Sequence, residues 1–426
     1  MVERRSRRSF LKGGAAGAFG GAALASPLAG LAQAVERTPQ SSSPSALRIT
    51  GVRGGLIRGQ HSLFVKVETN QGIHGCAEAV DGVYGTYYVM KHIAERHLIG
   101  RNPLDVHRLQ EEMRRGGLFK GAQAGMYVAV MSALETALWD LVGKALGLPV
   151  YQLLGGKFRD KIRVYCDTAG SRLPPEEMGR RAKEDVEKYG FTAVKFDIDD
   201  AADPRKLDRY NWSVSLPELE RMVGQIAAVR AAVGPHIDIC VDCHGRFDEQ
   251  SGHRIAKAME PFNLMWLEEP VPAEFPEAYA RIRQETTTPI CGGENWYLTY
   301  GFRRPLEIAA CDVIMPDLQK AGGLGEGQRI ASLANTYNVP FAPHMVASYL
   351  GAMASAHVCA SVPNFLILEW QIYFHTDKMF QEIVTFDGPM LTADGHIPLR
   401  EAPGIGVEID EDALRKYAVK DVPFFE

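Results

Sequence analysis

Hydrophobic and polar residues follow one pattern in the first part of the chain. Residues 61–72 alternate between polar and apolar side chains and end in an Asn-Gln-Gly turn, so residues 73–79 can return as a paired strand. Helical periodicity follows over residues 127–146. The apolar positions on one face of this helix are Val130, Leu134, Leu138 and Leu141. Strands followed by helices predict a small α+β domain from about residue 47 to about residue 156.

The pattern changes after Gly155 and Gly156, where short apolar strands begin to alternate with amphipathic helical stretches. The predicted strands lie at residues 162–166, 192–196, 237–241, 264–267, 289–291, 313–315, 339–342 and 365–368. Eight such units predict a closed (β/α)8 barrel of the TIM type within an α/β protein. The first unit has no GxGxxG turn, so the sequence does not support a dinucleotide site.

The N-terminus follows neither pattern. Ser-Arg-Arg-Ser-Phe-Leu-Lys at residues 6–12 precedes a run rich in Gly, Ala and Leu at residues 13–31, and Ala-Gln-Ala follows at residues 32–34. This resembles a twin-arginine export signal with cleavage after Ala34. The run is glycine-rich, weakly apolar and close to the shortest membrane-spanning length, which favours a signal over an anchor. We therefore expect a periplasmic protein with no stable membrane association after cleavage.

Composition adds few constraints. A length of 426 residues exceeds one ordinary domain, and a net charge of -5 is too small to indicate nucleic acid or an acidic membrane as partner. The seven cysteines are an odd number with no disulfide framework in their spacing. Cys240 and Cys243 form a CxxC sequence inside a predicted strand, which indicates buried thiols rather than a redox motif.

Ionisable residues stand at or just beyond the predicted strand ends, where barrel enzymes carry their catalytic groups. They are Lys195, Asp242, His244, Glu268, Glu294, Asp317, His344 and Glu369. From Asp242 onward, leaving out His244, successive members are 26, 26, 23, 27 and 25 residues apart by subtraction of their numbers. This is about the length of one βα unit, so these side chains can converge on one mouth.

Three carboxylates from adjacent strands, Asp242, Glu268 and Glu294, predict a metal site. Oxygen ligands with open positions suit Mg2+, whereas zinc recruits more His or Cys. A single acidic residue at a strand end is more often a helix cap or part of a loop salt bridge. Three in succession at barrel spacing favour the metal.

The remaining strand-end residues are candidates for proton transfer. Asp317 can fix the tautomer of His344 and raise its basicity, although a lone histidine is often a packed core residue. His244 can serve as a second proton-transfer group or as a neighbour of the metal. Lys195 can be a general base, a cation that holds a substrate carboxylate, or an interior lysine paired with a carboxylate. Glu369 can hydrogen-bond a developing enediolate oxygen or orient the substrate.

The long loop after the second predicted barrel strand, residues 197–216, has two interpretations. Its polar and aromatic side chains are Asp199, Asp200, Asp203, Arg205, Arg209, Tyr210 and Trp212. Long loops at the mouth of a barrel are often functional, and a solvated surface excursion is the alternative.

Several motifs in order resemble the enolase superfamily, mandelate racemase/muconate lactonizing enzyme branch. They are Leu-Trp-Asp-Leu at 138–141 with Gly-Leu-Pro-Val-Tyr-Gln-Leu-Leu-Gly-Gly at 147–156, Val-Asp-Cys-His-Gly-Arg at 241–246, Trp-Leu-Glu-Glu-Pro at 266–270, Gly-Gly-Glu at 292–294, Pro-Asp-Leu at 316–318 with Ala-Gly-Gly at 321–323, and Pro-His at 343–344. The resemblance implies a capping domain over residues 47–160, a barrel over 161–395 and a C-terminal segment, 396–426, that returns to the capping domain. A signal over 1–34 and a linker over 35–46 precede them.

Departures from the family pattern narrow the expected reaction. Racemases carry a second lysine where this chain has Asp197, and many relatives have Asn where this chain has His244. The Asp-x-His-Gly-Arg sequence is similar to that of galactonate dehydratase-like sugar-acid dehydratases. The resemblance implies His344 as the base at C2, His244 as the acid at the C3 hydroxyl, a metal-stabilised enediolate and a 2-keto-3-deoxy acid as product. The two histidine roles exchange if the substrate has the opposite configuration at C2.

We expect an aldonate or aldarate as substrate and a homo-oligomer as the assembly. Substrate contacts are expected from Asp197, Arg246, Tyr84 and Trp370. The alternatives are a racemase, epimerase or cycloisomerase on the same scaffold and a noncatalytic periplasmic ligand-binding protein.

Overall fold

The computed structural model describes residues 46–58, 62–168, 172–206, 208 and 210–426. The predicted export signal, residues 1–34, and all but the last residue of the predicted linker, residues 35–46, lie outside the described residues.

The first domain is an antiparallel sheet covered by helices. Its strands are β1 (Ile49–Leu56), β2 (Leu63–Thr69) and β3 (His74–Ala79), and its main helices are α2 (Tyr84–Ile93), α3 (Val106–Gly116) and α4 (Gly125–Leu146). A π-helical turn at Ala94–Leu98, a 3-10 turn at Leu118–Lys120 and the short helix α5 (Val150–Leu153) complete it. The turn between β2 and β3 contains Gly72 at φ +76°, a left-handed conformation that glycine adopts without strain.

Helix α4 is the core of this domain. Gly75 lets β3 lie directly on the helix, because a Cβ atom there would lie 2.0 Å from the carbonyl oxygen of Ala137. The apolar face predicted for this helix is fully buried, at Val130, Leu134, Leu138 and Leu141. The helix is long and apolar enough to cross a membrane, but 89% of its apolar window is buried inside the fold, which is typical of a core helix.

The second domain is the predicted (β/α)8 barrel. Its strands are β4 (Lys161–Asp167), β5 (Ala193–Asp197), β6 (Asp238–Asp242), β7 (Trp266–Glu268), β8 (Ile290–Gly292), β9 (Val313–Ile314) and β10 (Leu368–Gln371). Strands β4 to β9 pair in parallel in this order, and β10 pairs with β4. The bridges of Phe341 to Ile314 and Phe365 fill the gap between β9 and β10, so the sheet closes on itself, as the sequence predicts.

The seventh strand position differs from the prediction. Phe341 alone occupies it and bridges Ile314 on one side and Phe365 on the other. Pro340 has no N–H to give to a ladder, so the predicted strand over residues 339–342 is reduced to one bridging residue.

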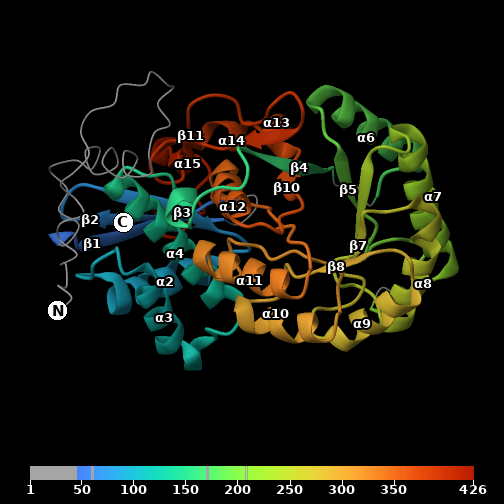
Figure 1. Ribbon diagram of the computed structural model, residues 1–426, viewed down its shortest axis with the longest axis horizontal. Coiled ribbons are helices and arrows are strands. Elements are labelled where there is room, and N and C mark those ends of the chain that lie inside the picture. Colours follow the sequence, from blue (N-terminus) through green and yellow to red (C-terminus); the bar gives the residue numbers. More distant parts are fainter. Residues whose placement is uncertain (1–45, 59–61, 169–171, 207, 209) are drawn as a thin grey trace, which may run out of the picture.

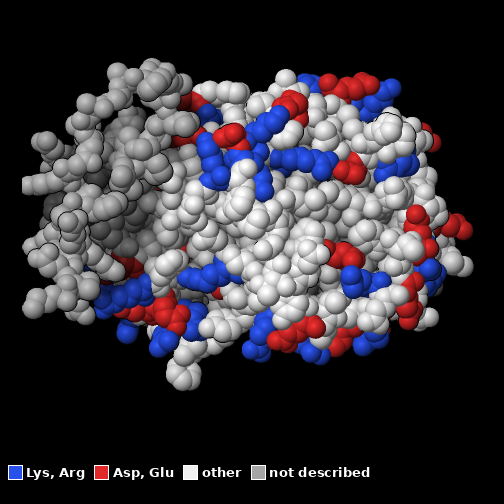
Figure 2. Space-filling model, viewed as in Figure 1, with Lys and Arg blue, Asp and Glu red and all other residues white. Residues whose placement is uncertain are grey.

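Helices surround the barrel. They are α6 (Pro175–Tyr189), α7 (Leu216–Val233), α8 (Glu249–Met259), α9 (Pro276–Glu285), α10 (Leu298–Glu307), α11 (Leu324–Thr336) and α12 (Tyr349–Ser361), with a 3-10 turn at Glu260–Phe262. Figure 1 shows α6 to α9 on the side of the barrel away from the β1–β2–β3 sheet, whereas α11 contacts α4 and α12 contacts β3. On the face shown in Figure 2, acidic and basic side chains lie beside one another.

The barrel interior is apolar below the mouth. The side chains that fill it are Tyr165, Ala193, Cys240, Trp266, Cys291, Val313, Met315, Ala342 and Ile367. All seven cysteines of the chain fall in the described residues, and all are buried and free, which confirms the expectation of buried thiols at Cys240 and Cys243.

The C-terminal segment contacts both domains. Its elements, after α13 (Tyr373–Thr376) and α14 (Lys378–Glu382), are β11 (Val384–Thr385), β12 (His396–Pro398), β13 (Glu408–Ile409) and α15 (Glu411–Arg415). Strand β12 pairs with the start of β4, so residues 396–398 still belong to the barrel wall. Farther on, Ala418 bridges Ile57, and the amide of Phe425 donates to the carbonyl of Gly54 at 2.6 Å. The chain end therefore lies on β1.

Candidate active site

Three carboxylates meet at the mouth of the barrel. Asp242 ends β6, Glu268 ends β7 as its register partner, and Glu294 follows β8. One oxygen from each lies within 4.8 Å of the others, and all three side chains are buried. Burial and the neighbouring Asp242 raise the pKa of Glu268 well above its ordinary value. This crowding of like charge is what a bound cation relieves, so the donor set fits a hard metal ion.

Lys195 on β5 lies beside this acidic cluster. Its Nζ atom is 3.3 Å from Asp242 Oδ2, 3.1 Å from Glu268 Oε1 and 2.8 Å from Glu369 Oε1. Burial opposes its charge, but these carboxylates raise its pKa well above the ordinary value. Of the three roles that the sequence left open, the geometry supports the interior lysine paired with carboxylates and disfavours a general base.

His344 and Asp317 form the predicted pair. His344 Nδ1 lies 2.8 Å from Asp317 Oδ2, and the other Asp317 oxygen accepts a 2.8 Å hydrogen bond from the amide of Gln319. His344 Nε2 faces Glu294 at 2.8 Å and Glu369 at 3.6 Å. Burial opposes the charge of the imidazole, but these carboxylates raise its pKa well above the ordinary value. With Nδ1 engaged, Nε2 is the atom that can exchange a proton at the mouth.

His244 has a carboxylate partner that the sequence analysis did not identify. Its Nδ1 lies 2.8 Å from Asp199 Oδ1, and the Nε of Arg246 lies 2.6 Å from the other Asp199 oxygen. The charge of Asp242 first, against burial, and then the hydrogen bond to Asp199 raise the pKa of His244 to about 11. His244, just beyond the end of β6, is thus a second possible proton donor, and Asp199 orients its ring.

The backbone brings His244 to the mouth by a turn rather than by a continued strand. Strand β6 ends at Asp242, and His244 has φ +47°, followed by Gly245 at φ +61°. The His244 amide donates to Asp242 Oδ1 at 2.7 Å. A left-handed conformation is costly for a residue with a side chain, and such strain is typical of functional sites.

The residues predicted to contact the substrate lie in different surroundings and differ in exposure. Asp197 ends β5 opposite Asp242, and burial first, then nearby Asp167 and Asp242, raise its pKa to about 7. Arg246 is half-exposed and tied to Asp199. Tyr84 begins α2 and is exposed.

Trp370 is not brought to the mouth. Its side chain is fully buried, stacks edge-on against Phe374 at 4.7 Å between ring centroids, and donates its indole N–H to His375 at 3.2 Å. Neighbouring residues of a strand point to opposite faces. Because Glu369 points into the barrel, Trp370 points outward to the helices, and its predicted substrate contact is wrong.

The structure adds polar groups that the strand-end rule did not select. Asn295 donates to Glu269 Oε2 at 2.8 Å and to Glu294 Oε1 at 3.0 Å. Lys320, buried in the loop after β9, contacts Asp81 of the capping domain at 2.9 Å. The repeated Glu of Trp-Leu-Glu-Glu-Pro and the lysine three residues after Asp317 were the available signals.

A cavity of about 490 Å³ opens beside these groups. Its lining includes His244, Glu269, Asn295 and Tyr297. This volume is in the range of small-molecule sites in proteins. A histidine held by Asp199 thus borders a space of the right size for a small polar ligand.

Fold and site together define a (β/α)8-barrel enzyme that carries an acidic cluster and oriented histidines at its mouth. The chain belongs to the mandelate racemase/muconate lactonizing enzyme family of the enolase superfamily. Residues 35–155 match the family's N-terminal domain, and residues 177–413 match the enolase C-terminal domain-like model.

Relatives of similar sequence are named as dehydratases. The chain is 38% identical over 380 residues to D-xylonate dehydratase of Haloferax volcanii, covering 89% of this chain and 90% of the relative. It is 32% identical over 358 residues to D-galactonate dehydratase of Xanthomonas oryzae, covering 83% and 90%. A mandelate racemase/muconate lactonizing enzyme-like protein from Rubrobacter xylanophilus superposes with a TM-score of 0.85 at 44% identity, covering 89% of this chain and 100% of that one.

Proposed function

We propose that the protein is a Mg2+-dependent hydro-lyase that converts a sugar acid into a 2-keto-3-deoxy acid. The observation that carries this proposal is the presence of two imidazoles, each with a carboxylate 2.8 Å from Nδ1, beside one acidic cluster. Dehydration next to a carboxylate needs one group to remove the α-proton and another to protonate the departing hydroxyl. His344 with Asp317 and His244 with Asp199 meet both needs.

Asp242, Glu268 and Glu294 are the residues that would hold Mg2+. Their donor atoms are all carboxylate oxygens, which match the preference of this ion. When bound, Mg2+ supplies positive charge at the substrate carboxylate oxygens, where negative charge accumulates as the α-proton leaves. Lys195 forms ion pairs with Asp242 and Glu268 of this cluster.

In the proposed reaction, His344 acts in its neutral form, and its Nε2 removes the proton from C2. Nε2 of His244 then gives a proton to the C3 hydroxyl as the C3–O bond breaks, and water leaves. The resulting enol takes up a proton at C3 and becomes the ketone, so the overall change is the loss of one water without oxidation or reduction. A substrate of the opposite configuration at C2 exchanges the two histidine roles.

Two features favour dehydration over racemisation. Racemisation needs a base on each face of the substrate, and Asp197 stands where racemases carry the second lysine. The lysine that is present, Lys195, is paired with three carboxylates and held in its charged form. The relatives named for D-xylonate and D-galactonate support an aldonate as substrate.

The test is a substrate screen with the purified protein and Mg2+. Aldonic and aldaric acids are offered, and both 2-keto product and exchange of the α-proton with solvent deuterium are measured. We expect 2-keto acid from at least one aldonate. Exchange without loss of water on every acid tested would favour an epimerase or racemase, and neither exchange nor product would favour a noncatalytic binder.

We also infer export to the periplasm by the twin-arginine route and assembly into a homo-oligomer. The support for export is the sequence at residues 6–12 and the Ala-Gln-Ala site at 32–34. Replacing Arg7 and Arg8 by Lys is expected to retain the protein in the cytoplasm of fractionated cells. Light scattering of the mature protein tests the assembly.

A further inference from the structure

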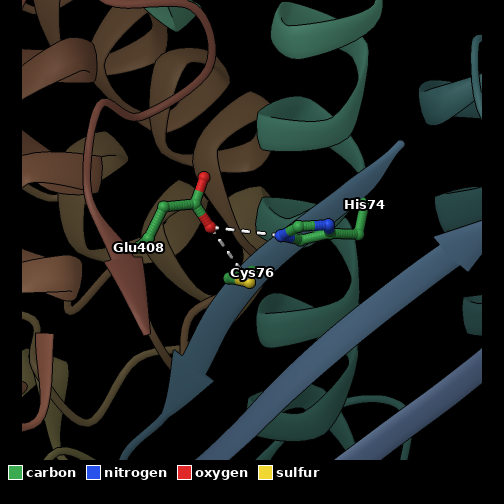
Figure 3. A group of neighbouring side chains, drawn as sticks. All are labelled: His74, Cys76 and Glu408. Atoms are coloured by element: carbon green, nitrogen blue, oxygen red, sulfur yellow. Dashed lines mark hydrogen bonds and ion pairs between the residues drawn. The ribbon is translucent and has the colours of Figure 1, made fainter. Parts of the chain in front are cut away.

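A second group of potential metal ligands lies outside the barrel mouth. His74 and Cys76 stand two residues apart on β3, so both side chains leave the same face of the strand. Glu408 on β13 of the C-terminal segment faces them. Figure 3 shows the imidazole Nε2 and the thiol of this group directed at the Glu408 carboxylate.

The spacing of the three donor atoms matches a metal ion. Glu408 Oε2 lies 3.2 Å from His74 Nε2 and 3.8 Å from Cys76 Sγ, and all three atoms lie within 4.8 Å of one another. Around tetrahedral Zn2+, with bonds of 2.0 to 2.3 Å, ligand atoms are roughly 3.3 to 3.8 Å apart. The site is therefore close to the required geometry without a change of backbone.

The backbone on both sides of the site is fixed by one buried carboxylate. Asp140 on α4 accepts hydrogen bonds of 2.8 Å from the amide of Cys76 and of 2.8 Å from the amide of Ile405. It thereby holds β3 and the approach to β13 at one point. Glu408 is 332 residues from Cys76 and 334 residues from His74 in the chain. Because the fold already holds these segments together, metal binding does not have to supply the entropy cost of closing that loop.

The charges around the group also suit a divalent cation. Lys144 contacts Asp140 and the Oε1 atom of Glu408, which leaves Oε2 directed at His74 and Cys76. While the Cys76 thiol is protonated, the positive charge of Lys144 faces the two negative charges of Asp140 and Glu408. The group therefore carries one net negative charge. A divalent cation that displaces the thiol proton adds one positive charge and leaves the group neutral.

The three proposed ligands differ in their exposure to solvent, and this difference leaves one side of the site open to an entering ion. The side chains of His74 and Glu408 are 35% and 43% exposed, whereas Cys76 is fully buried. An ion can enter from the exposed side, and water can complete its coordination there. The buried thiol supplies the soft ligand that the barrel mouth does not have.

We propose that His74, Cys76 and Glu408 bind one borderline-soft divalent cation, for which Zn2+ is the best match, and that this ion ties the C-terminal segment to the capping sheet. A thiolate and an imidazole favour Zn2+ over Mg2+, and the three carboxylates at the mouth favour the reverse. Binding exchanges the thiol proton for the metal, and the proton goes to solvent. The protein thus has two cation sites of opposite preference.

Cobalt(II) distinguishes the two sites, because only a site with a thiolate gives a ligand-to-metal charge-transfer band in the near ultraviolet. The mature full-length protein is saturated with Mg2+ and then titrated with Co2+. We expect the band to saturate at one Co2+ per chain and to disappear on addition of Zn2+. The Cys76→Ser variant is expected to lose the band, and His74→Gln to bind Co2+ at least tenfold more weakly.

Cys311→Ser is the matched control, since it removes another buried free thiol and is expected to keep the band. Zn2+ should also raise the Tm of the wild type and of Cys311→Ser, but not that of Glu408→Gln. If Cys76→Ser fails to fold, His74→Gln and Glu408→Gln decide the question, because both replace partly exposed side chains. Absence of the band at millimolar Co2+, or its persistence in folded Cys76→Ser, overturns the proposal.

Discussion

His244 Nδ1 lies 2.8 Å from Asp199 Oδ1. The same distance separates His344 Nδ1 from Asp317 Oδ2. Asp199 is buried and its second oxygen is held by Arg246, so the carboxylate cannot easily turn away. It fixes the ring orientation of His244 and leaves Nε2 toward the mouth. Asp199 is therefore a positioning residue for the proposed acid.

The Asp199→Asn variant is expected to lower kcat by about 10²-fold, because general acid catalysis contributes roughly 10² to 10⁴ and much of it depends on orientation. Asp199 also helps to raise the pKa of His244. Since the acid must be protonated, loss of Asp199 lowers that pKa and moves the alkaline limb of the kcat profile to lower pH. Initial rates across pH measure both effects.

Asp200→Asn is the control for this prediction. Asp200 is the next residue in the chain, but it contacts Arg172 at 3.2 Å instead of a histidine. We expect its kcat and pH profile to resemble those of the wild type. Equal losses in the Asp199 and Asp200 variants, with no shift of the alkaline limb in either, would show that the contact to His244 has no role in catalysis.

Removing each histidine separates the two halves of the reaction. His344→Asn is expected to lower the rates of both α-proton exchange and dehydration by roughly 10² to 10⁴-fold. His244→Asn is expected to keep exchange and lose dehydration, because its role begins only after the α-proton has left. Deuterium incorporation and 2-keto product are measured on the same samples. The reverse pattern assigns the base to His244.

The sequence predicted the mouth residues well because barrel topology fixes where they lie. The ends of parallel strands converge on one face, so Asp242, Glu268 and Glu294 could be brought together from spacing alone. Their observed positions, within 4.8 Å at one oxygen each, follow from that rule. The pairing of Asp317 with His344 is of the same kind, since both stand just beyond neighbouring strand ends.

The errors lie where the path of individual residues decides the outcome. Trp370 is predicted to contact the substrate, but it directly follows the inward-pointing Glu369, and strand alternation turns it to the helices. Asp199 reaches His244 because that histidine takes a left-handed backbone conformation, which no periodicity reveals. The partners of Lys195 depend on three different strand ends and could not be chosen from its position alone.

Removal of the metal is expected to abolish turnover and lower stability. Asp242, Glu268 and Glu294 crowd three carboxylates into a buried site, so a bound cation relieves their repulsion. Dialysis against a chelator should eliminate activity and reduce Tm. Added Mg2+ should restore activity and the part of the Tm loss that belongs to the barrel mouth, since the same dialysis also removes the Zn2+ proposed at His74, Cys76 and Glu408. Glu268→Gln should not recover activity with Mg2+. The control is Glu277→Gln, which changes an exposed glutamate that pairs with Arg304 and should recover activity. Full turnover by metal-free protein contradicts the proposed mechanism.

Glu78 links the capping domain to the loop that carries His344. It is fully buried, and its Oε1 atom accepts hydrogen bonds from the amide of Ser348 at 3.0 Å, the hydroxyl of Ser348 at 2.5 Å and the amide of Gly351 at 3.0 Å. Its Oε2 atom has no hydrogen-bond partner among the described residues. Burial raises its pKa from 4.5 to about 7, against these hydrogen bonds.

This shift gives stability a defined pH dependence. A carboxyl group whose folded-state pKa is raised contributes stability that is present below its unfolded pKa of 4.5 and lost as pH rises through about 7. Glu78→Gln keeps the Oε1 acceptor and cannot ionise. Its free energy of unfolding relative to the wild type should therefore increase between pH 5 and pH 8, by up to about 3 kcal/mol. Denaturant unfolding at each pH measures the difference.

The contrasting variant is Glu135→Gln. Glu135 is also buried, but both of its oxygens accept N–H groups, from Trp139 and Gly325 at one oxygen and from Leu324 at the other. Burial raises the pKa of Glu135 to about 7 as well, but a protonated carboxyl oxygen can still accept an N–H group, whereas an amide NH2 cannot. This variant should therefore be less stable than the wild type at pH 5, where Glu78→Gln should be close to it. A stability difference for Glu78→Gln that stays constant from pH 5 to pH 8 would show that Glu78 is ionised throughout.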